Sequence, residues 1–261
     1  MTATAEASGV RIAWERRGEG APLLLIHGLG YARWGWEPVV DALAGHHEVV
    51  LFDNRGIGES EAPPGPYSVA ELARDAAAVL DAAGLEQAHV LGTSLGGMVA
   101  LQLALEHPAC LDKLVLACTT PGGSGAAPMP EQTLRLMAEA PSLPADVALR
   151  RFVENAFGPD HDVAVVDRIM EHRLATAQPQ AAWMAQAAAG AGFDAWDRVG
   201  EVRAPTLVLT GDADNVVDPR NSELLAQRIP DARLEVFAGA GHLFFWEHPQ
   251  RFVDVVREFL R

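Results

Sequence analysis

The sequence predicts an α/β fold built on a mostly parallel, doubly wound sheet. Short apolar runs, which suit strands buried on both faces, alternate with segments of helical periodicity, as in repeated β-α-β units. The opening run GVRIAWERRG instead alternates apolar and polar residues, which indicates antiparallel pairing at one edge of the sheet. A single large domain of this kind is ordinary for a chain of 261 residues.

Each expected strand ends in turn residues. In chain order, the expected strands are LLLIHG, VVLFDN, HVLGTS, KLVLACTT, TLVLTGD and RLEVFAG. Between the second and the third, apolar residues recur every three or four positions in SVAELARDAAAVLDAAG. This spacing predicts a helix that begins after an N-cap at Ser68 and stops at Gly84.

The alternation of strands and helices breaks in the middle of the chain. Between Pro121 and Trp196, a stretch rich in Pro and Gly gives way to Ala-rich helical segments. We therefore expect a core formed by residues 1–120 and 197–261, and a helical insertion over residues 121–196. Because open α/β sheets bind ligands beyond the carboxyl ends of their strands, an insertion between two strands is interpreted as a lid over that region.

Composition argues against several classes of partner. A formal net charge of -15, without any block of Lys and Arg, would repel nucleic acid and anionic lipid surfaces. The start MTATAEASG lacks the pattern of a signal peptide, and no apolar run reaches the roughly 20 residues of a membrane span, so we expect a cytoplasmic protein. Cys110 and Cys118 are expected to be buried structural thiols, and we expect no metal and no cofactor.

The segment Gly92-Thr93-Ser94-Leu95-Gly96 follows an expected strand and precedes an expected helix. In a G-x-S-x-G turn, the tight bend strains the serine backbone while small neighbours prevent collisions, so the hydroxyl projects above the sheet. A serine in such a turn can instead cap the helix, but the glycines favour a nucleophile. Ser94 is therefore the candidate nucleophile.

A serine nucleophile needs a general base, and the base needs an acid that orients it. The run DADNVVD follows TLVLTG, and His242 follows RLEVFAGAG, which gives the chain order Ser, Asp, His. This order makes His242 the candidate base. It leaves three candidates for the acid, Asp212, Asp214 and Asp218.

These motifs together resemble the α/β-hydrolase family, along LLLIHGLG, FDNRGIGES, GTSLGG, GDADNVV and GAGH. The resemblance extends over nearly the whole chain outside the insertion. It implies that Asp214 orients His242. It also implies an oxyanion hole formed by the backbone N–H groups of Leu29 and Leu95, with His27 bracing the first of these loops rather than taking part in the chemistry.

The same fold carries several chemistries, so the site must decide between them. Ser94 argues against relatives that use an aspartate nucleophile, such as dehalogenases and epoxide hydrolases. The chain looks closer to small-molecule esterases, 3-oxoadipate enol-lactonases and carbon-carbon bond hydrolases than to other members of the family. Among these activities we expect cleavage of an ester or lactone through an acyl-enzyme. A carbon-carbon bond hydrolase or a cofactor-free peroxidase would use the same triad, and a ligand receptor that kept the fold is the non-enzyme alternative. A homo-oligomer is compatible with the sequence.

Apolar side chains near the motifs are candidates for substrate binding. Trp34, Trp183 and Met184 suit an adaptable apolar pocket, although the same residues could pack neighbouring helices. A carboxylated substrate would need a cationic partner, although each arginine of the insertion could instead be a solvated helix residue. The arginines of the insertion are Arg135, Arg150, Arg151, Arg168 and Arg173.

Overall fold

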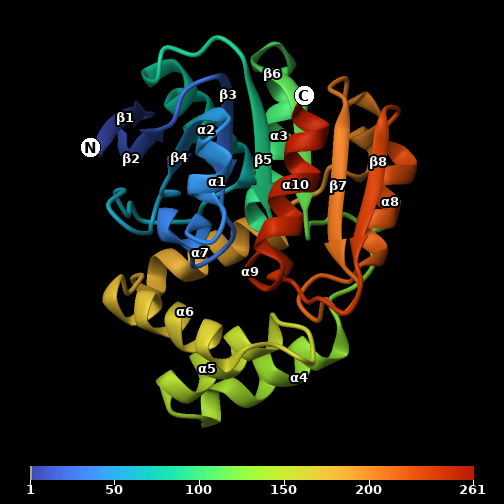
Figure 1. Cartoon of the computed structure of the whole chain (residues 1–261). Helices are drawn as coiled ribbons and strands as arrows, with labels where there is room; N and C mark the ends of the chain where they lie inside the picture. Colours follow the sequence, from blue (N-terminus) through green and yellow to red (C-terminus); the bar gives the residue numbers. More distant parts are fainter. Residues whose placement is uncertain (1) are drawn as a thin grey trace.

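An eight-stranded mixed sheet forms the centre of the computed structural model, which describes residues 2–261 (Figure 1). The strands are β1 (Ala3–Ala7), β2 (Val10–Arg17), β3 (Ala21–Ile26), β4 (His47–Phe52), β5 (Ala88–Thr93), β6 (Leu111–Ala117), β7 (Thr206–Gly211) and β8 (Ala232–Phe237). Their order across the sheet is β1-β2-β4-β3-β5-β6-β7-β8. The pairs β1-β2 and β2-β4 are antiparallel and the other neighbours are parallel. The expected parallel sheet with an antiparallel edge is confirmed.

Helices cover both faces of this sheet. One face packs against α2 (Val69–Ala82), α3 (Leu95–Glu106) and α8 (Arg220–Arg228). The opposite face packs against α1 (Val40–Ala44), α9 (Phe244–Glu247) and α10 (Pro249–Leu260). Short 3-10 helices complete the connections: η1 (Arg33–Trp36), η2 (Pro108–Cys110), η3 (Ala140–Ser142) and η4 (Trp196–Glu201).

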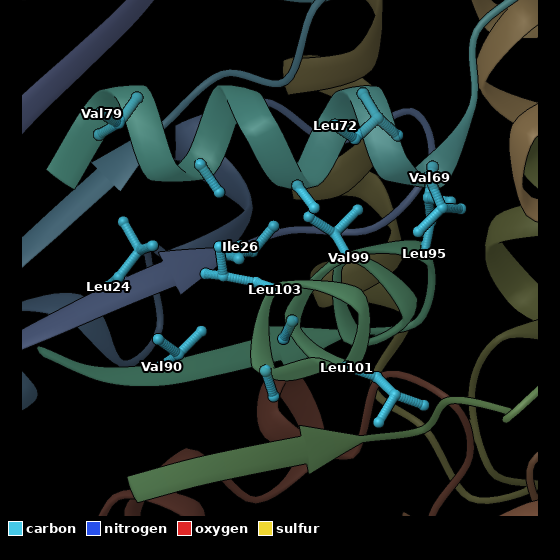
Figure 2. Packing of buried hydrophobic residues seen from close by; sticks show 14 of the residues in the cluster. Leu24, Ile26, Val69, Leu72, Val79, Val90, Leu95, Val99, Leu101 and Leu103 are labelled. Atoms are coloured by element: carbon cyan, nitrogen blue, oxygen red, sulfur yellow. The ribbon is translucent and has the colours of Figure 1, made fainter. Parts of the chain in front are cut away.

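The core beside α3 is built mostly from branched aliphatic side chains. Burial of each such side chain stabilises the fold by about 1.5 to 3 kcal/mol, which is why the continuous apolar runs of the sequence become central strands. Figure 2 shows side chains of the central strands meeting those of α2 and α3. Those labelled are Leu24, Ile26, Val69, Leu72, Val79, Val90, Leu95, Val99, Leu101 and Leu103.

Helix α2 begins where the sequence predicts. The Ser68 hydroxyl accepts the N–H of Glu71 at 3.2 Å, and the Glu71 carboxylate accepts the N–H of Ser68 at 2.9 Å. This reciprocal pair satisfies two amides that the first helical turn leaves without intrahelical partners. Gly84 follows the helix with φ +71°, a backbone conformation that favours glycine.

Within the described residues, four α-helices lie between β6 and β7: α4 (Glu131–Glu139), α5 (Ala145–Asn155), α6 (Val163–Ala175) and α7 (Gln180–Ala191). They lie together beyond the carboxyl ends of the parallel strands (Figure 1). The two ends of this segment pair at its base, through a bridge between Gly122 and Asp194 and a hydrogen bond from the N–H of Ala195 to the carbonyl of Pro121 at 2.9 Å. The insertion therefore leaves and rejoins the core at one place. No helix of the described residues is long and apolar enough to cross a membrane.

Candidate active site

Ser94 occupies a strained turn between β5 and α3. Its backbone has φ 55° and ψ -121°, a conformation that L-residues rarely adopt. Two hydrogen bonds hold the turn: the N–H of Ser94 donates to the carbonyl of Ala117 at 2.9 Å, and the Thr119 hydroxyl donates to the carbonyl of Ser94 at 2.7 Å. The neighbouring strand β6 and the residues after it therefore hold the Ser94 backbone in its strained conformation.

The glycines of the motif allow this turn to approach its neighbours. A Cβ on Gly92 would lie 2.1 Å from the carbonyl oxygen of Gly96, and a Cβ on Gly96 would lie 2.1 Å from the carbonyl oxygen of Ile26. No side chain fits at such distances, because the atoms it would meet are backbone atoms. The G-x-S-x-G spacing is thus dictated by close packing of backbone around Ser94.

Ser94 lines a cavity of about 630 Å³ between the core and the insertion. From the core, His242 and the loop of residues 27–31 line the same cavity. From the insertion, the lining includes apolar residues of α5 and Trp183 of α7. The candidate nucleophile and the candidate base therefore line the same cavity.

The structure brings Asp214, rather than the two rival carboxylates, to the imidazole. His242 Nδ1 and Asp214 Oδ2 are 2.7 Å apart and both side chains are buried. Asp214 also accepts the N–H groups of Val216 and Val217, which fix the orientation of its carboxylate. Asp212 instead accepts the N–H of Gly239, and Asp218 pairs with Arg220.

The two histidines of the cavity have opposite electrostatic surroundings. Burial alone would lower the pKa of His242, but the Asp214 carboxylate, with a contribution from the Cys118 side chain, raises that pKa well above its usual value. For His27, burial dominates and lowers the pKa to about 3, so its ring is neutral. His27 Nδ1 accepts the N–H of Gly28, and its ring stacks on Tyr31 at 4.7 Å, so it is built to hold its loop in place.

The backbone supplies hydrogen-bond donors on either side of Ser94. Leu29 lines the cavity, and Leu95 is the first residue of α3, with its side chain turned into the core (Figure 2). Among residues 2–261, neither of these two N–H groups has an acceptor. Free amides at a helix start and in a facing loop are the donors that a tetrahedral oxyanion requires.

Residues 21–249 match the alpha/beta hydrolase fold family. The chain belongs to this family. Its fold is the one that the sequence resemblance implied.

Relatives of this α/β hydrolase are named for different substrates. The chain is 33% identical to the pimeloyl-[acyl-carrier protein] methyl ester esterase of Aeromonas hydrophila, over 95% of this chain and 99% of that protein. It is 32% identical to the 2-hydroxy-6-oxo-6-phenylhexa-2,4-dienoate hydrolase of Comamonas testosteroni, over 98% of this chain and 93% of that protein. The crystal structure of the enol-lactonase from Burkholderia xenovorans superposes with a TM-score of 0.87 at 26% identity, covering 99% of each chain.

Of the three expected substrate-binding residues, only Trp183 lines the Ser94 cavity of this hydrolase. Trp34 does not line that cavity but the adjoining hollow of about 660 Å³, where its ring stacks on His172 at 4.7 Å and its Nε1–H donates to Thr176. Met184 is 55% exposed and does not line the cavity, because neighbouring residues of a helix point about 100° apart and Trp183 takes the inward direction. The structure thus corrects the expectation for Trp34 and Met184.

Arg173 differs from the other arginines of the insertion. Within residues 2–261, no carboxylate lies within ion-pair distance of its guanidinium, and its buried Nε–H has no acceptor. The guanidinium lies over the ring of Tyr31 at 4.6 Å and against Gly30, where a Cβ would be 2.5 Å from Nη1. It lines the Ser94 cavity. The other four are paired with carboxylates: Arg135 with Glu131, Arg150 with Asp167, Arg151 with Glu139, and Arg168 with Glu37.

The two cysteines differ in their surroundings. Cys118 is buried, as expected, but it also lines the Ser94 cavity with φ 45° and affects the pKa of His242. The sequence signal for this placement is its position directly after β6, the strand beside the one that leads into Ser94. Cys110 is only half-buried, which corrects the expectation for that thiol, because it follows a surface turn and donates to the carbonyl of His107. In the described part of the chain, no cluster of His, Cys, Asp or Glu side chains forms a candidate metal site.

Proposed function

We propose that this α/β hydrolase cleaves a small-molecule carboxylic ester or lactone through an acyl-enzyme on Ser94. The observation that carries the proposal is the strained Ser94 in the same cavity as His242, whose Nδ1 is held by the buried carboxylate of Asp214. A serine hydroxyl is a weak nucleophile by itself, and a neutral imidazole held by a carboxylate is the group that activates it.

The geometry supports a two-step acyl transfer. The Ser94 hydroxyl oxygen attacks the substrate carbonyl carbon while its proton moves to Nε2 of His242, and Asp214 stabilises the imidazolium that forms. The N–H groups of Leu29 and Leu95 stabilise the tetrahedral oxyanion. The imidazolium then protonates the departing alkoxide, which leaves an ester of Ser94. Water, deprotonated by His242, then attacks this ester. The acid departs, and the imidazolium returns its proton to the Ser94 oxygen.

Relatives support this class of substrate. The Aeromonas relative is named for a methyl ester and the Burkholderia structure is an enol-lactonase. Both substrates are carboxylic esters in the chemical sense, since a lactone is a cyclic ester. The same catalytic groups therefore suit either one, and the shape of the cavity decides between them.

We further assign a carboxylate to the substrate, recognised by Arg173. A guanidinium without a counter-ion in a largely apolar cavity is unfavourable unless a ligand provides the negative charge. A guanidinium presents two parallel N–H donors to a carboxylate, which gives a strong and directional contact. The Comamonas relative, by its name, hydrolyses a dienoate, which is a carboxylate.

Replacing Arg173 with glutamine should lower kcat/KM about 10- to 100-fold for an ester that carries a free carboxylate, the size of effect expected for a lost hydrogen bond to a charged group. The matched neutral ester should lose much less. Steady-state kinetics on the pair of esters measures this difference. Arg135→Gln is the control, because Arg135 is exposed and pairs with Glu131. Equal losses on both esters would contradict a role in carboxylate recognition.

Replacing Trp183 with alanine should change the ranking of kcat/KM across esters of increasing acyl length, because each lost apolar contact is equivalent to about 1 to 3 kcal/mol. The neighbouring substitution Met184→Ala is the matched control and should leave the ranking unchanged, since Met184 is exposed outside the cavity. Kinetics on a series of p-nitrophenyl esters measures the ranking. If Met184→Ala changes it as much as Trp183→Ala does, the assignment of the cavity lining is wrong.

A substrate panel tests the proposed function itself. The panel contains p-nitrophenyl esters, lactones, their carboxylated counterparts and a β-diketone, each incubated with the purified protein. Turnover of an ester or lactone with release of the acid is expected. Cleavage of the β-diketone without any ester turnover would favour a carbon-carbon bond hydrolase, and binding without turnover of any compound would favour a ligand receptor.

A further inference from the structure

The loop that carries His242 is tied to the insertion by one side chain, Glu247 of α9. Glu247 Oε1 accepts the N–H of Gly241 at 2.8 Å, and Oε2 accepts the N–H of Gly158 at 3.1 Å. Gly241 directly precedes the candidate base, and Gly158 follows α5 in the insertion. One carboxylate therefore bridges the backbone beside the base and the backbone of the insertion.

The two bridged segments are in direct backbone contact. A Cβ on Gly241 would lie 2.4 Å from the carbonyl carbon of Phe157, and a Cβ on Gly158 would lie 2.2 Å from the carbonyl oxygen of Gly239. Their amides cannot hydrogen-bond to one another, because both are donors. The Glu247 carboxylate satisfies them together, because each of its two oxygens accepts one of the two N–H groups.

The backbone on the other side of His242 is held by the insertion as well. The N–H of Leu243 donates to the carbonyl of Ala156 at 2.9 Å. Helix α9 itself is anchored by Phe244 and Phe245, which are fully buried. The position from which Glu247 reaches Gly241 is therefore rigid, and so is the backbone that follows the imidazole.

We propose that Glu247 is a positioning residue, which by bridging Gly241 and Gly158 fixes the imidazole of His242 between Asp214 and Ser94. Through the same bridge, the position of the imidazole depends on where the insertion packs against the core. The inference rests on the proposed function, in which His242 is the general base. A displacement of a catalytic group by about 1 Å can lower a rate about 100-fold, so a modest shift of this loop has a large effect.

Two variants separate the geometry of the bridge from its charge. Glu247→Gln keeps the size of the side chain but places an NH₂ donor against one of the two N–H groups. Glu247→Asp keeps the charge but is one methylene shorter, so it cannot reach both amides. Glu235→Gln is the matched control, because Glu235 is half-exposed and pairs with Arg251 away from the cavity.

The first readout is kinetic. Both Glu247 variants should lower kcat about 10- to 100-fold with little change in KM, because the base is misplaced while the cavity is retained. The thermal unfolding midpoint shows whether each variant is folded at the assay temperature. If the folded Glu247 variants match Glu235→Gln and wild type in kcat, Glu247 does not position the base and the inference is overturned.

The second readout does not depend on turnover. The proton shared by His242 Nδ1 and Asp214, whose heavy atoms are 2.7 Å apart, should give a low-field proton NMR resonance, assigned by its loss in His242→Gln. In both Glu247 variants this resonance should shift or broaden, whereas Glu235→Gln should leave it unchanged. An unchanged resonance, even with a lower unfolding midpoint, would mean that Glu247 supports only the fold. If wild type has the resonance but cleaves no ester or lactone, the proposed function fails separately from the inference.

Discussion

Replacing Ser94 with alanine is expected to lower kcat about 10⁴- to 10⁶-fold, because the variant lacks the oxygen that forms the acyl-enzyme. The fold should be retained, because the turn is held by the backbone N–H and carbonyl of residue 94, which alanine also has. The N–H donates to the carbonyl of Ala117, and the carbonyl accepts the hydroxyl of Thr119. Steady-state kinetics on the best ester of the panel measures the loss, and thermal unfolding checks the fold.

Ser142→Ala is the control for this substitution. Ser142 is an exposed serine of the insertion whose hydroxyl donates to the carbonyl of Glu139. Its replacement should leave kcat unchanged. Removal of a nucleophile typically lowers kcat by several orders of magnitude. If Ser94→Ala keeps more than about a tenth of the wild-type kcat, another group must be the nucleophile.

Replacing Asp214 with asparagine should lower kcat about 10³- to 10⁴-fold, because an amide neither stabilises the imidazolium nor holds the reactive tautomer. Asp212→Asn is the matched control two residues away. Asp212 holds the N–H of Gly239 rather than the imidazole, so its replacement should have a milder effect. The opposite ranking of the two variants would transfer the orienting role to Asp212.

The pH dependence gives an independent check on Asp214. A protonated imidazole cannot accept the proton of Ser94, so kcat/KM should fall as the pH drops through the pKa of His242. Asp214 raises that pKa well above its usual value, so the wild-type acid limb should lie correspondingly high. In Asp214→Asn the residual activity should have its acid limb at lower pH, whereas Asp212→Asn should leave the limb in place. A limb that stays fixed in Asp214→Asn would contradict the assignment.

The fold could be predicted from the sequence because its signals are local. Continuous apolar runs and the cap at Ser68 act through neighbouring residues. The glycines around Ser94 form a short motif that can be recognised in the sequence, although Gly96 packs against the distant Ile26. The chain order of nucleophile, acid and base follows from the same turns at the ends of the strands. These features are independent of the packing of the insertion, so a single sequence is sufficient for them.

The lining of the cavity could not be predicted in the same way. Trp183 and Met184 are adjacent and both apolar, and only the rotation of α7 determines which one faces Ser94. The choice among the arginines of the insertion required their partners, since Arg173 stands out only because no carboxylate pairs with it among residues 2–261. The bridge made by Glu247 links segments that are far apart in the sequence, and no local pattern reports such a contact.

The most direct test of a covalent acyl-enzyme on Ser94 is mass spectrometry after reaction with a small fluorophosphonate, which mimics the tetrahedral intermediate and stays bound to an activated serine. Intact protein should gain the mass of one phosphonyl group, peptide mapping should locate it on Ser94, and Ser94→Ala should gain none. A phosphonyl group on any other residue, or a wild-type protein that hydrolyses esters yet gains no mass, would contradict the assignment of Ser94 as the nucleophile.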